Sequence, residues 1–224
     1  MFKLPIDQLS NYRLHTLYDK GFRPRTILDI GAYKGEWSQS MKKIFPFSKY
    51  FMVEGNKQCE PFLQKTDIPY QISMLSNYKK TISYYNHNGL DKSGNSVYRE
   101  RTDAYSDKNC NVEKVECDTL SNIVKMRKIS DIDFIKLDVQ GSEKDVINGG
   151  IDIIQNAKII LIELQLVEYN QGAPMLSDMI LYMKNIGFKL FDIIELHYTP
   201  NHVLLQVDAL FEKDNDIDSV KYFT

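Results

Sequence analysis

The feature that most constrains the fold is a short apolar run that passes through a glycine turn into a helix-like segment. Residues 27–30 are apolar apart from Asp29, and Gly31 and Gly35 lie in the turn that follows. A strand, a glycine turn and a helix in this order are typical of a buried parallel strand that presents backbone to a nucleoside-bearing ligand. Gly31 permits dihedral angles closed to other residues, and glycines let a ligand lie against the main chain.

The spacing of these glycines argues against a dinucleotide ligand. The dinucleotide fingerprint is Gly-x-Gly-x-x-Gly, and Tyr33 stands at its second glycine. A pyrophosphate pressed against the start of the helix would meet the bulky ring of Tyr33. A nicotinamide-dependent oxidoreductase is therefore disfavoured, and only hydride-transfer activity would restore that hypothesis.

Strand-like and helix-like segments alternate along the chain. The expected strands are residues 27–30, 50–54, 70–75, 81–85, 112–117, 132–137 and 158–164, and the expected helices are residues 6–20, 35–45, 57–65, a segment from about Asp118, and 174–186. Residues 188–196 and 203–211 flank Thr199-Pro-Asn-His202 and predict an antiparallel hairpin. The pattern predicts an α/β fold: a doubly wound, mostly parallel seven-stranded sheet with a C-terminal antiparallel hairpin. Because no linker interrupts it, we expect residues 1–224 to form one domain.

A long polar segment interrupts this alternation. Residues 86–111 are rich in Asn, Asp, Ser, Gly, Lys and Arg, and few of them are suited to a core. A loop of this length in a compact domain is usually functional or disordered. We expect the segment to lie on the substrate side of the sheet.

Acidic residues are expected at the carboxyl ends of several strands. Glu54 ends the second strand, where a carboxylate can accept hydrogen bonds from the two hydroxyls of a ribose. Asp138 ends the run at residues 132–137 beside the glycine turn, and Asp29 lies within the first strand. Unpaired acids that cluster are electrostatically costly. A cationic ligand such as a sulfonium would relieve that cost, whereas a phosphate would increase it.

Three further residues are expected near this edge. Leu75 and Ser76 follow the third strand, where an adenine face would lie or where the chain merely turns. Glu163 lies inside an apolar run. Buried carboxylates are rare unless they are partnered, so Glu163 is either functional or tied to a nearby backbone or basic group.

The order of these motifs resembles the FkbM family of S-adenosylmethionine (SAM)-dependent methyltransferases. The matching motifs are Asp29-x-Gly-Ala-x-x-Gly35, Val53-Glu-Gly-Asn56, Cys117-Asp-Thr-Leu120, Ile132-Asp-Phe-Ile-Lys-Leu-Asp-Val-Gln-Gly-Ser-Glu143, Asn148-Gly-Gly150 and Ile162-Glu163. The resemblance covers residues 27–166. It departs from the family at Gln140, where Glu is frequent, and at Gly55, where Pro or Ala is frequent. Gln140 weakens a role for that position as a catalytic acid or base.

This resemblance implies a class I, Rossmann-like methyltransferase with SAM as its cofactor and a sugar, glycan or small-metabolite hydroxyl as its acceptor. It implies that residues 93–98 border the acceptor. The expected cofactor-binding residues are Asp29, Gly31, Ala32, Tyr33, Gly35, Trp37, Glu54, Asn56, Leu75, Ser76 and Asp138.

The identity of a general base is open at this stage. The candidates are Asp138, then His87 in the polar segment, then Glu143. An exposed loop histidine is the slightly favoured alternative for His87, and His197 and His202 flank the hairpin turn as structural residues. A Mg²⁺-assisted variant would use Asp138 and Glu163 as carboxylate ligands. It is not favoured, because no Asp-Asn pair follows the strand that holds Glu163.

Composition limits the partners. Net charge is −2 and basic residues occur singly or in pairs, so we expect no nucleic-acid partner, although an RNA or protein methyltransferase stays an alternative. A non-catalytic binding module that uses its tyrosines is another alternative; these are Tyr84, Tyr85, Tyr98 and Tyr105.

Three cysteines without a Cys-x-x-Cys pair indicate neither zinc nor disulfides. With no membrane span and no signal peptide, a cytoplasmic location is expected.

Overall fold

The computed structural model describes residues 6–87, 95–101 and 110–214. In this part of the chain the main sheet has seven strands in the order β3-β2-β1-β7-β8-β10-β9. The strands are β1 (Thr26–Ile30), β2 (Lys49–Glu54), β3 (Tyr70–Ile72), β7 (Ile132–Leu137), β8 (Ile159–Gln165), β9 (Phe188–Tyr198) and β10 (Leu204–Lys213). Strands β1, β2, β3, β7 and β8 run parallel, and β10 lies antiparallel to both β8 and β9. The predicted fold class, with its terminal antiparallel hairpin, is confirmed.

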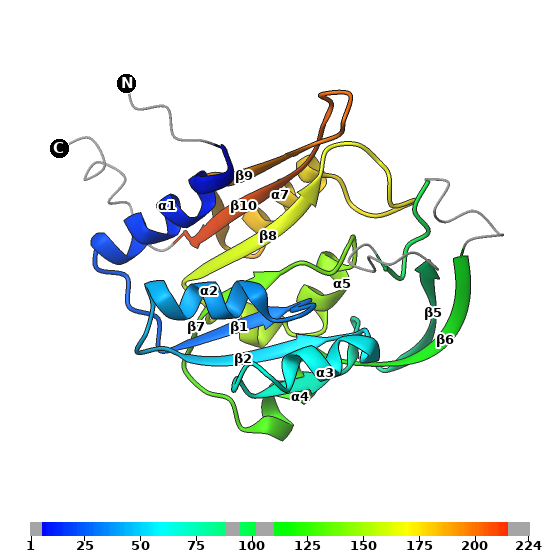
Figure 1. The fold of residues 1–224 in the computed structure, drawn as a ribbon, viewed down its shortest axis with the longest axis horizontal. Coiled ribbons are helices and arrows are strands. Elements are labelled where there is room, and N and C mark those ends of the chain that lie inside the picture. The colour runs from blue at the N-terminus through cyan, green and yellow to red at the C-terminus, as the bar shows by residue number, and fades with distance from the viewer. Residues whose placement is uncertain (1–5, 88–94, 102–109, 215–224) are drawn as a thin grey trace.

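The connections from β1 leave in two directions. The chain runs outward from β1 to β2 and β3, then returns to place β7 and β8 on the other side of β1 (Figure 1). In open α/β sheets, ligands bind in the crevice at the carboxyl ends of the strands where the strand order reverses. The carboxyl ends of β1 and β7 therefore mark the expected ligand site.

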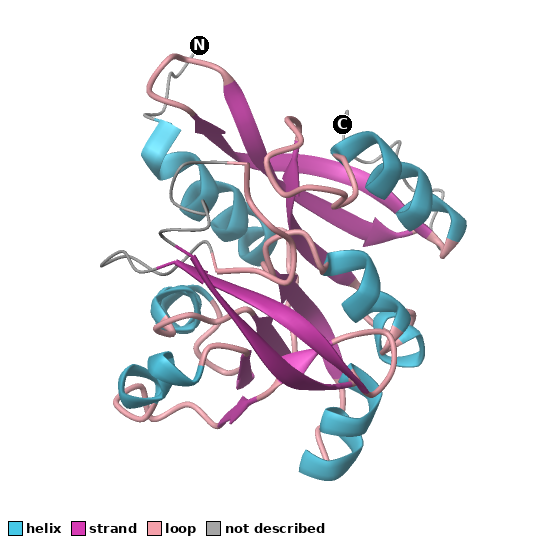
Figure 2. Cartoon of the chain, turned by 90° about the vertical axis from the view of Figure 1, so that its right-hand side faces the viewer, coloured by secondary structure: helices cyan, strands magenta, loops and turns pink. Residues whose placement is uncertain are grey.

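Helices cover both faces of the main sheet (Figures 1 and 2). They are α1 (Ile6–Asp19), α2 (Glu36–Ile44), the 3-10 helix η1 (Lys57–Cys59), α3 (Glu60–Leu63), α4 (Leu120–Arg127), α5 (Glu143–Asn148), α6 (Ile151–Ile154) and α7 (Leu176–Asn185). The helix expected over residues 57–65 is thus a 3-10 turn followed by one short α-helical turn. None of the helices in the described part of the chain has the length and apolar character needed to cross a bilayer.

Alternate residues of the central strands pack into two separate hydrophobic cores, because successive side chains in a strand point to opposite faces of the sheet. Ile27 packs with residues of α1, α2 and α3 on one face of the sheet. Its neighbour Leu28 packs with residues of α4, α5, α6 and α7 on the other face. Because both faces are covered, the central strands are apolar almost throughout. Polar residues in them, such as Asp29 and Lys136, therefore stand out as candidates for function.

A second sheet lies beyond the carboxyl ends of the main strands. It has the strand order β4-β6-β5 and consists of β4 (Met74–Leu75), β5 (Lys80–His87) and β6 (Cys110–Asp118). The long β5–β6 ribbon stands at the end of the molecule toward which β1, β2, β7 and β8 point (Figure 1), and it faces the viewer in Figure 2. It forms one wall of the region where a ligand is expected.

The prediction of one continuous strand over residues 70–75 is wrong. The segment divides at Ser73 into β3, which pairs with β2, and β4, which pairs with β6 in the second sheet. Ser73 donates its backbone N–H to the Glu54 carbonyl, at 2.9 Å, at the point of division. The predicted polar segment, residues 86–111, begins in β5 and ends in β6. Residues 88–94 and 102–109 of it lie outside the described residues.

Candidate functional site

The turn after β1 is held against the end of β7. The Asp138 backbone N–H donates to the Ile30 carbonyl at 2.9 Å. Gly31 has φ 79°, and a Cβ atom on it would lie 1.7 Å from the carbonyl oxygen of Asp138. This close approach, together with the left-handed backbone, explains why glycine is required at position 31. Tyr33 also adopts a left-handed conformation, with φ 48°. Strained backbone of this kind in a non-glycine residue clusters at functional sites.

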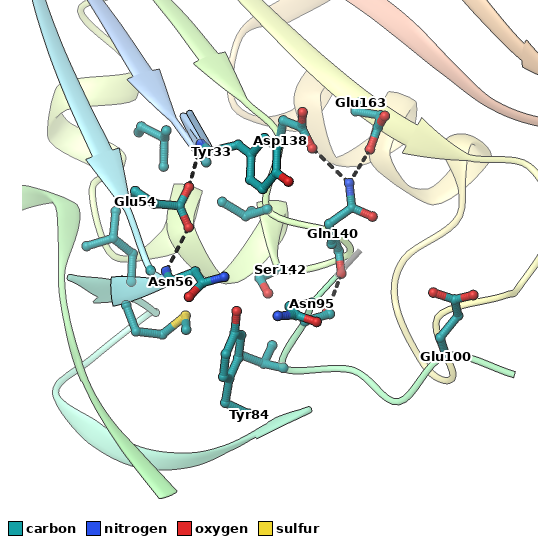
Figure 3. A pocket seen from close by; sticks show the side chains of 18 of the residues that line it. Tyr33, Glu54, Asn56, Tyr84, Asn95, Glu100, Asp138, Gln140, Ser142 and Glu163 are labelled. Atoms are coloured by element: carbon teal, nitrogen blue, oxygen red, sulfur yellow. Dashed lines mark hydrogen bonds between the residues drawn. The ribbon is translucent and has the colours of Figure 1, made fainter. Parts of the chain in front are cut away.

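The carboxylate of Glu54 is fixed by two backbone amides. Tyr33 N–H donates to Glu54 Oε2 at 2.6 Å, and Asn56 N–H donates to Glu54 Oε1 at 2.7 Å (Figure 3). An ionised carboxylate offers about four lone-pair sites, so each oxygen keeps one for a ligand. Burial raises the pKa of Glu54, and the two amide bonds oppose that rise. The arrangement suits a pair of neutral hydroxyl donors, such as those of a ribose.

A cavity of about 550 Å³ opens at this edge of the main sheet. Its size falls within the range of ordinary small-molecule sites, roughly 300–1,000 Å³. It runs from the β1 turn and the end of β2, past the end of β7, to β8 and the terminal hairpin. Residues of β4 and β5 lie on its opposite wall. Its lining includes the carboxylates Glu54, Glu100, Asp138 and Glu163, the polar side chains Asn56, Asn95, Ser142, Thr199 and Gln206, and the rings of Tyr33, Tyr84 and Tyr169.

One amide bridges two carboxylates inside the cavity. Gln140 Nε2 donates to Asp138 Oδ1 at 2.9 Å and to Glu163 Oε2 at 2.7 Å (Figure 3). Gln140 has φ 53°, and its carbonyl accepts hydrogen bonds from Ser96 Oγ at 2.5 Å and Asn170 Nδ2 at 3.2 Å. The backbone and the side chain of Gln140 are therefore both fixed. The departure from the FkbM pattern at this position thus has a defined structural role.

A buried cation balances part of this charge. Lys136 Nζ lies 3.1 Å from Asp138 Oδ2 and 3.6 Å from Asp29 Oδ1, beneath the cavity floor. Asp29 is fully buried and also accepts a hydrogen bond from Ser38 Oγ at 2.7 Å. Asp29 is thus absent from the cavity lining. It acts on the site by holding Lys136 beside Asp138.

The carboxylates differ in their protonation. Burial alone would raise the pKa of Asp138, but Lys136 outweighs burial and lowers it, with a further contribution from Gln140. For Glu163, burial and the charge of Asp138 raise the pKa well above its ordinary value. Burial also raises the pKa of Asp29. The pKa of Asp138 therefore lies below that of Glu163, and Asp138 is the member of the bridged pair that ionises more readily.

Glu143 supports the turn that follows β7. Its Oε1 accepts hydrogen bonds from the backbone N–H groups of Val139 and Gly141, both at 3.1 Å. Burial raises its pKa to about 7. The side chain lies beneath the turn and is absent from the lining of the main cavity.

The predicted cofactor residues fall into two groups. The cavity lining contains Gly31, Tyr33, Glu54, Asn56, Leu75 and Asp138. The others, Asp29, Ala32, Gly35, Trp37 and Ser76, lie outside that lining, and Ser76 lines a smaller neighbouring cavity of about 200 Å³. Gly35 is buried, and a Cβ atom on it would lie 2.9 Å from the Cγ2 atom of Thr66. Ala32 belongs to the hydrophobic core on the α2 side of the sheet. Trp37 packs edge-on against Phe134, with 5.8 Å between the ring centroids.

His87 is the last residue of β5, where it pairs with Cys110, and its side chain lies outside the description. Tyr105 is likewise outside the described residues.

Sequence reasoning missed several residues that line the cavity. Tyr169, Thr199 and Gln206 come from a loop and from the terminal hairpin, where the sequence shows no motif, whereas Asn95 lies within residues 93–98, which the family resemblance implied would border the acceptor. Thr199 was interpreted only as part of a turn. The tyrosine content near the polar segment was a further signal, and it pointed to Tyr84.

Several solved structures with a similar fold are described as methyltransferases. The plantazolicin methyltransferase BamL, solved with a desmethyl plantazolicin analogue and S-adenosylhomocysteine (SAH), has a TM-score of 0.54 at 11% identity, covering 93% of this chain and 84% of its own. The precorrin-6y C5,15-methyltransferase of Geobacter metallireducens has a TM-score of 0.51 at 11% identity, with 92% and 88% covered. TrmK of M. capricolum, solved with SAH, has a TM-score of 0.51 at 12% identity, with 91% and 68% covered. These likenesses define the fold as that of class I SAM-dependent methyltransferases.

The sequence itself identifies the family. The family model described as "Methyltransferase FkbM domain" matches residues 29–190, which is most of the chain. The chain therefore belongs to the FkbM methyltransferase family and is a SAM-dependent methyltransferase. No curated protein sequence matches it.

Proposed function

We propose that this methyltransferase transfers the methyl group of SAM to a hydroxyl group of a neutral, sugar-like acceptor. The main support for this proposal is the acidic character of the side chains that line the cavity. Among the described residues that line it there are four carboxylates and no Lys, Arg or His. A phosphate-bearing acceptor would be repelled there, whereas a polyol can donate hydrogen bonds to carboxylates and amides.

The residues of the cavity also fit the cofactor. When bound, SAM supplies an activated methyl group on a positively charged sulfonium. The free lone pairs of Glu54 are placed to accept hydrogen bonds from two ribose hydroxyls. The ionised carboxylate of Asp138 offers a favourable electrostatic environment to a cationic ligand.

The chain contributes mainly by positioning. In transfer to a hydroxyl, the sulfur–carbon bond breaks, an oxygen–carbon bond forms and the hydroxyl proton must leave. Holding the acceptor oxygen in line with the methyl group contributes roughly 7–11 kcal/mol to lowering the barrier. A general base adds roughly 10²–10⁴-fold. We assign the base role to Asp138, because it lines the cavity and Lys136 keeps it ionised.

Transfer of a radiolabelled methyl group tests the acceptor class. The purified protein is incubated with methyl-labelled SAM and, separately, with neutral oligosaccharides and polyhydroxylated metabolites, total RNA, and a peptide pool. Label is expected in the hydroxyl-rich neutral fraction. Label that appears only in RNA or peptides would overturn the proposal, and so would SAM binding without transfer to any acceptor, which would indicate a binding module.

Two variants then test the base. Asp138→Asn is expected to lower kcat by roughly 10²–10⁴-fold. Asp152→Asn, a substitution at an exposed position of α6, is expected to leave kcat unchanged. Equal kcat values for Asp138→Asn and the unmodified chain would remove Asp138 from the mechanism.

A further inference from the structure

Three side chains that commonly bind metals meet on one face of the sheet, on three neighbouring strands. Asp208 of β10 lies directly opposite Glu163 of β8 in the register. His197 of β9 approaches the same point, with its Nε2 atom 3.3 Å from Asp208 Oδ1. One ligand atom from each of the three side chains lies within 4.8 Å of the other two. Small rotations of the side chains would bring all three to one ion.

Solvent can reach this cluster, and its three residues lie on paired strands. The side chain of His197 is 35% exposed and that of Asp208 is 17% exposed, so an ion can enter from solvent. The backbones belong to paired strands, which fix the spacing of the three residues. Gln140 donates to Glu163 Oε2 only, and the other carboxylate oxygen receives no bond from that amide. The Gln140 contact also orients the Glu163 carboxylate, as hydrogen bonds to ligand side chains do in metal sites.

The donor set of the cluster suits a cation. One imidazole and two carboxyl groups meet there, and a metal ion binds such a set in its deprotonated form, with release of any proton that Glu163 carries. The buried cation nearby, Lys136, is already in ion pairs with Asp29 and Asp138. In contrast, the position between Asp138 and Glu163, where a Mg²⁺ ion was considered from the sequence, is occupied by the amide of Gln140. The cluster on β8, β9 and β10 is thus the better cation site.

We propose that Glu163, His197 and Asp208 bind one divalent transition-metal ion. A mixed set of imidazole nitrogen and carboxylate oxygen suits Zn²⁺ and its neighbours better than Mg²⁺ or Ca²⁺, which prefer oxygen ligands alone. Three protein ligands leave at least one coordination position open, as in catalytic zinc sites. Because Glu163 also lines the cavity, the ion lies at the edge of the proposed acceptor site. A role for that open position in holding an acceptor hydroxyl rests on the proposed function, but binding of the ion does not.

Titration of the full chain with Zn²⁺ tests the proposal directly. The protein is treated with a chelator, dialysed, and titrated calorimetrically with ZnCl₂ in the absence of SAM and acceptor. We expect saturable binding of about one ion per chain. Replacement of Zn²⁺ by Co²⁺ should give visible absorption bands that report nitrogen and oxygen ligands.

Matched variants assign the ligands. His197→Ala and the isosteric Asp208→Asn are each expected to weaken Zn²⁺ binding at least about tenfold. Two controls remove other ligand side chains, His202→Asn at the exposed hairpin turn and Cys110→Ser on β6, and they should bind as the unmodified chain does. Asn suits position 202 because it tolerates the left-handed φ of 59° found there. Circular dichroism confirms that each variant is folded.

The outcome of the titration can be distinguished from the outcome of the acceptor assay. No saturable Zn²⁺ binding, or binding that His197→Ala and Asp208→Asn both leave unchanged, overturns the metal site and leaves an ordinary His197–Asp208 ion pair. Because the titration measures no methyl transfer, its failure would not touch the proposed function. Failure of the acceptor assay would likewise not touch the metal site.

Discussion

At the scale of residues, the site depends on one buried cation. Lys136 is only 8% exposed and lies between Asp29 and Asp138. Removing one partner of a buried ion pair leaves an uncompensated charge, at a cost of about 3–5 kcal/mol. Lys136→Met should therefore lower the free energy of unfolding by about that amount near pH 8, measured by urea denaturation.

Two companion variants serve as controls for this unfolding measurement. Lys158 is paired with Asp133 but its side chain is 61% exposed, so Lys158→Met should cost less than about 1 kcal/mol. Adding Asp29→Asn to Lys136→Met should recover part of the loss, because one of the unpaired carboxylates is then neutral. If Lys136→Met and Lys158→Met lower the free energy of unfolding by the same amount, Lys136 is not the counter-ion of Asp29 and Asp138.

A second residue-scale prediction concerns pH. Burial raises the pKa of Glu143 from its ordinary 4.5 to about 7, so folding favours the protonated form. The stability that this proton contributes is complete below pH 4.5 and is lost as the pH rises to about 7. The loss amounts to about 3 kcal/mol at 1.36 kcal/mol per pKa unit. Glu143→Gln mimics the protonated form and should gain on the unmodified chain by that amount between pH 4.5 and pH 8 in urea titrations. A pH-independent difference between the two proteins would contradict the assigned pKa.

The sequence reveals residues at strand ends better than residues that act through partners. Glu54 and Asp138 were predicted because a parallel strand delivers its last side chain to the ligand edge. The bridge made by Gln140 was not predictable, because it depends on a left-handed backbone at Gln140 and on the spacing of β7 and β8. Glu143 was a candidate base, and only the structure places its carboxylate on two turn amides. His197 was interpreted as structural because it flanks the hairpin turn, and its approach to Glu163 depends on the pairing of β10 with both β8 and β9.

At the scale of elements, the contact between the β1 turn and the end of β7 shapes the cavity. A Cβ on Gly31 would lie 1.7 Å from the Asp138 carbonyl oxygen, whereas Gly187 has a similar φ, 91°, and open space around it. Gly187→Ala should cost about 1–2 kcal/mol for the left-handed backbone alone. Gly31→Ala should cost about 1–3 kcal/mol more, because β1 and β7 must separate. Urea unfolding of both variants measures the difference, and equal costs would show that the turn is free to shift.

Alternation of strand-like and helix-like segments, followed by two runs joined by a turn, was enough to predict the main sheet and its terminal hairpin. It did not predict that the strand expected over residues 70–75 divides at Ser73 between two sheets. Both halves are apolar and extended, and the difference between them is the partner strand, β2 for one and β6 for the other. Pairing between segments far apart in sequence leaves no local signal. The second sheet could therefore not be derived, although its strands β5 and β6 were expected individually.

At the scale of the whole molecule, the net charge of −2 conceals an uneven distribution. Four carboxylates line one cavity at the carboxyl edge of the sheet, while Lys136 lies beneath it. The doubly wound topology produces this arrangement by bringing the ends of β2, β7 and β8 to a single edge. A cationic cofactor and a neutral acceptor fit that edge better than an anionic substrate.

Calorimetric titration with SAH, comparing the unmodified chain with Glu54→Gln, is the most direct test of the central claim that this edge binds SAM. We expect micromolar binding of SAH and no binding of NAD⁺. Loss of the charged acceptor for ribose hydroxyls, worth about 1.5–3 kcal/mol, should weaken SAH about 10–100-fold in Glu54→Gln. Glu60→Gln on α3, outside the cavity lining, should bind SAH normally. Absence of SAH binding, or equal affinity in Glu54→Gln and the unmodified chain, would contradict the placement of the cofactor in this cavity.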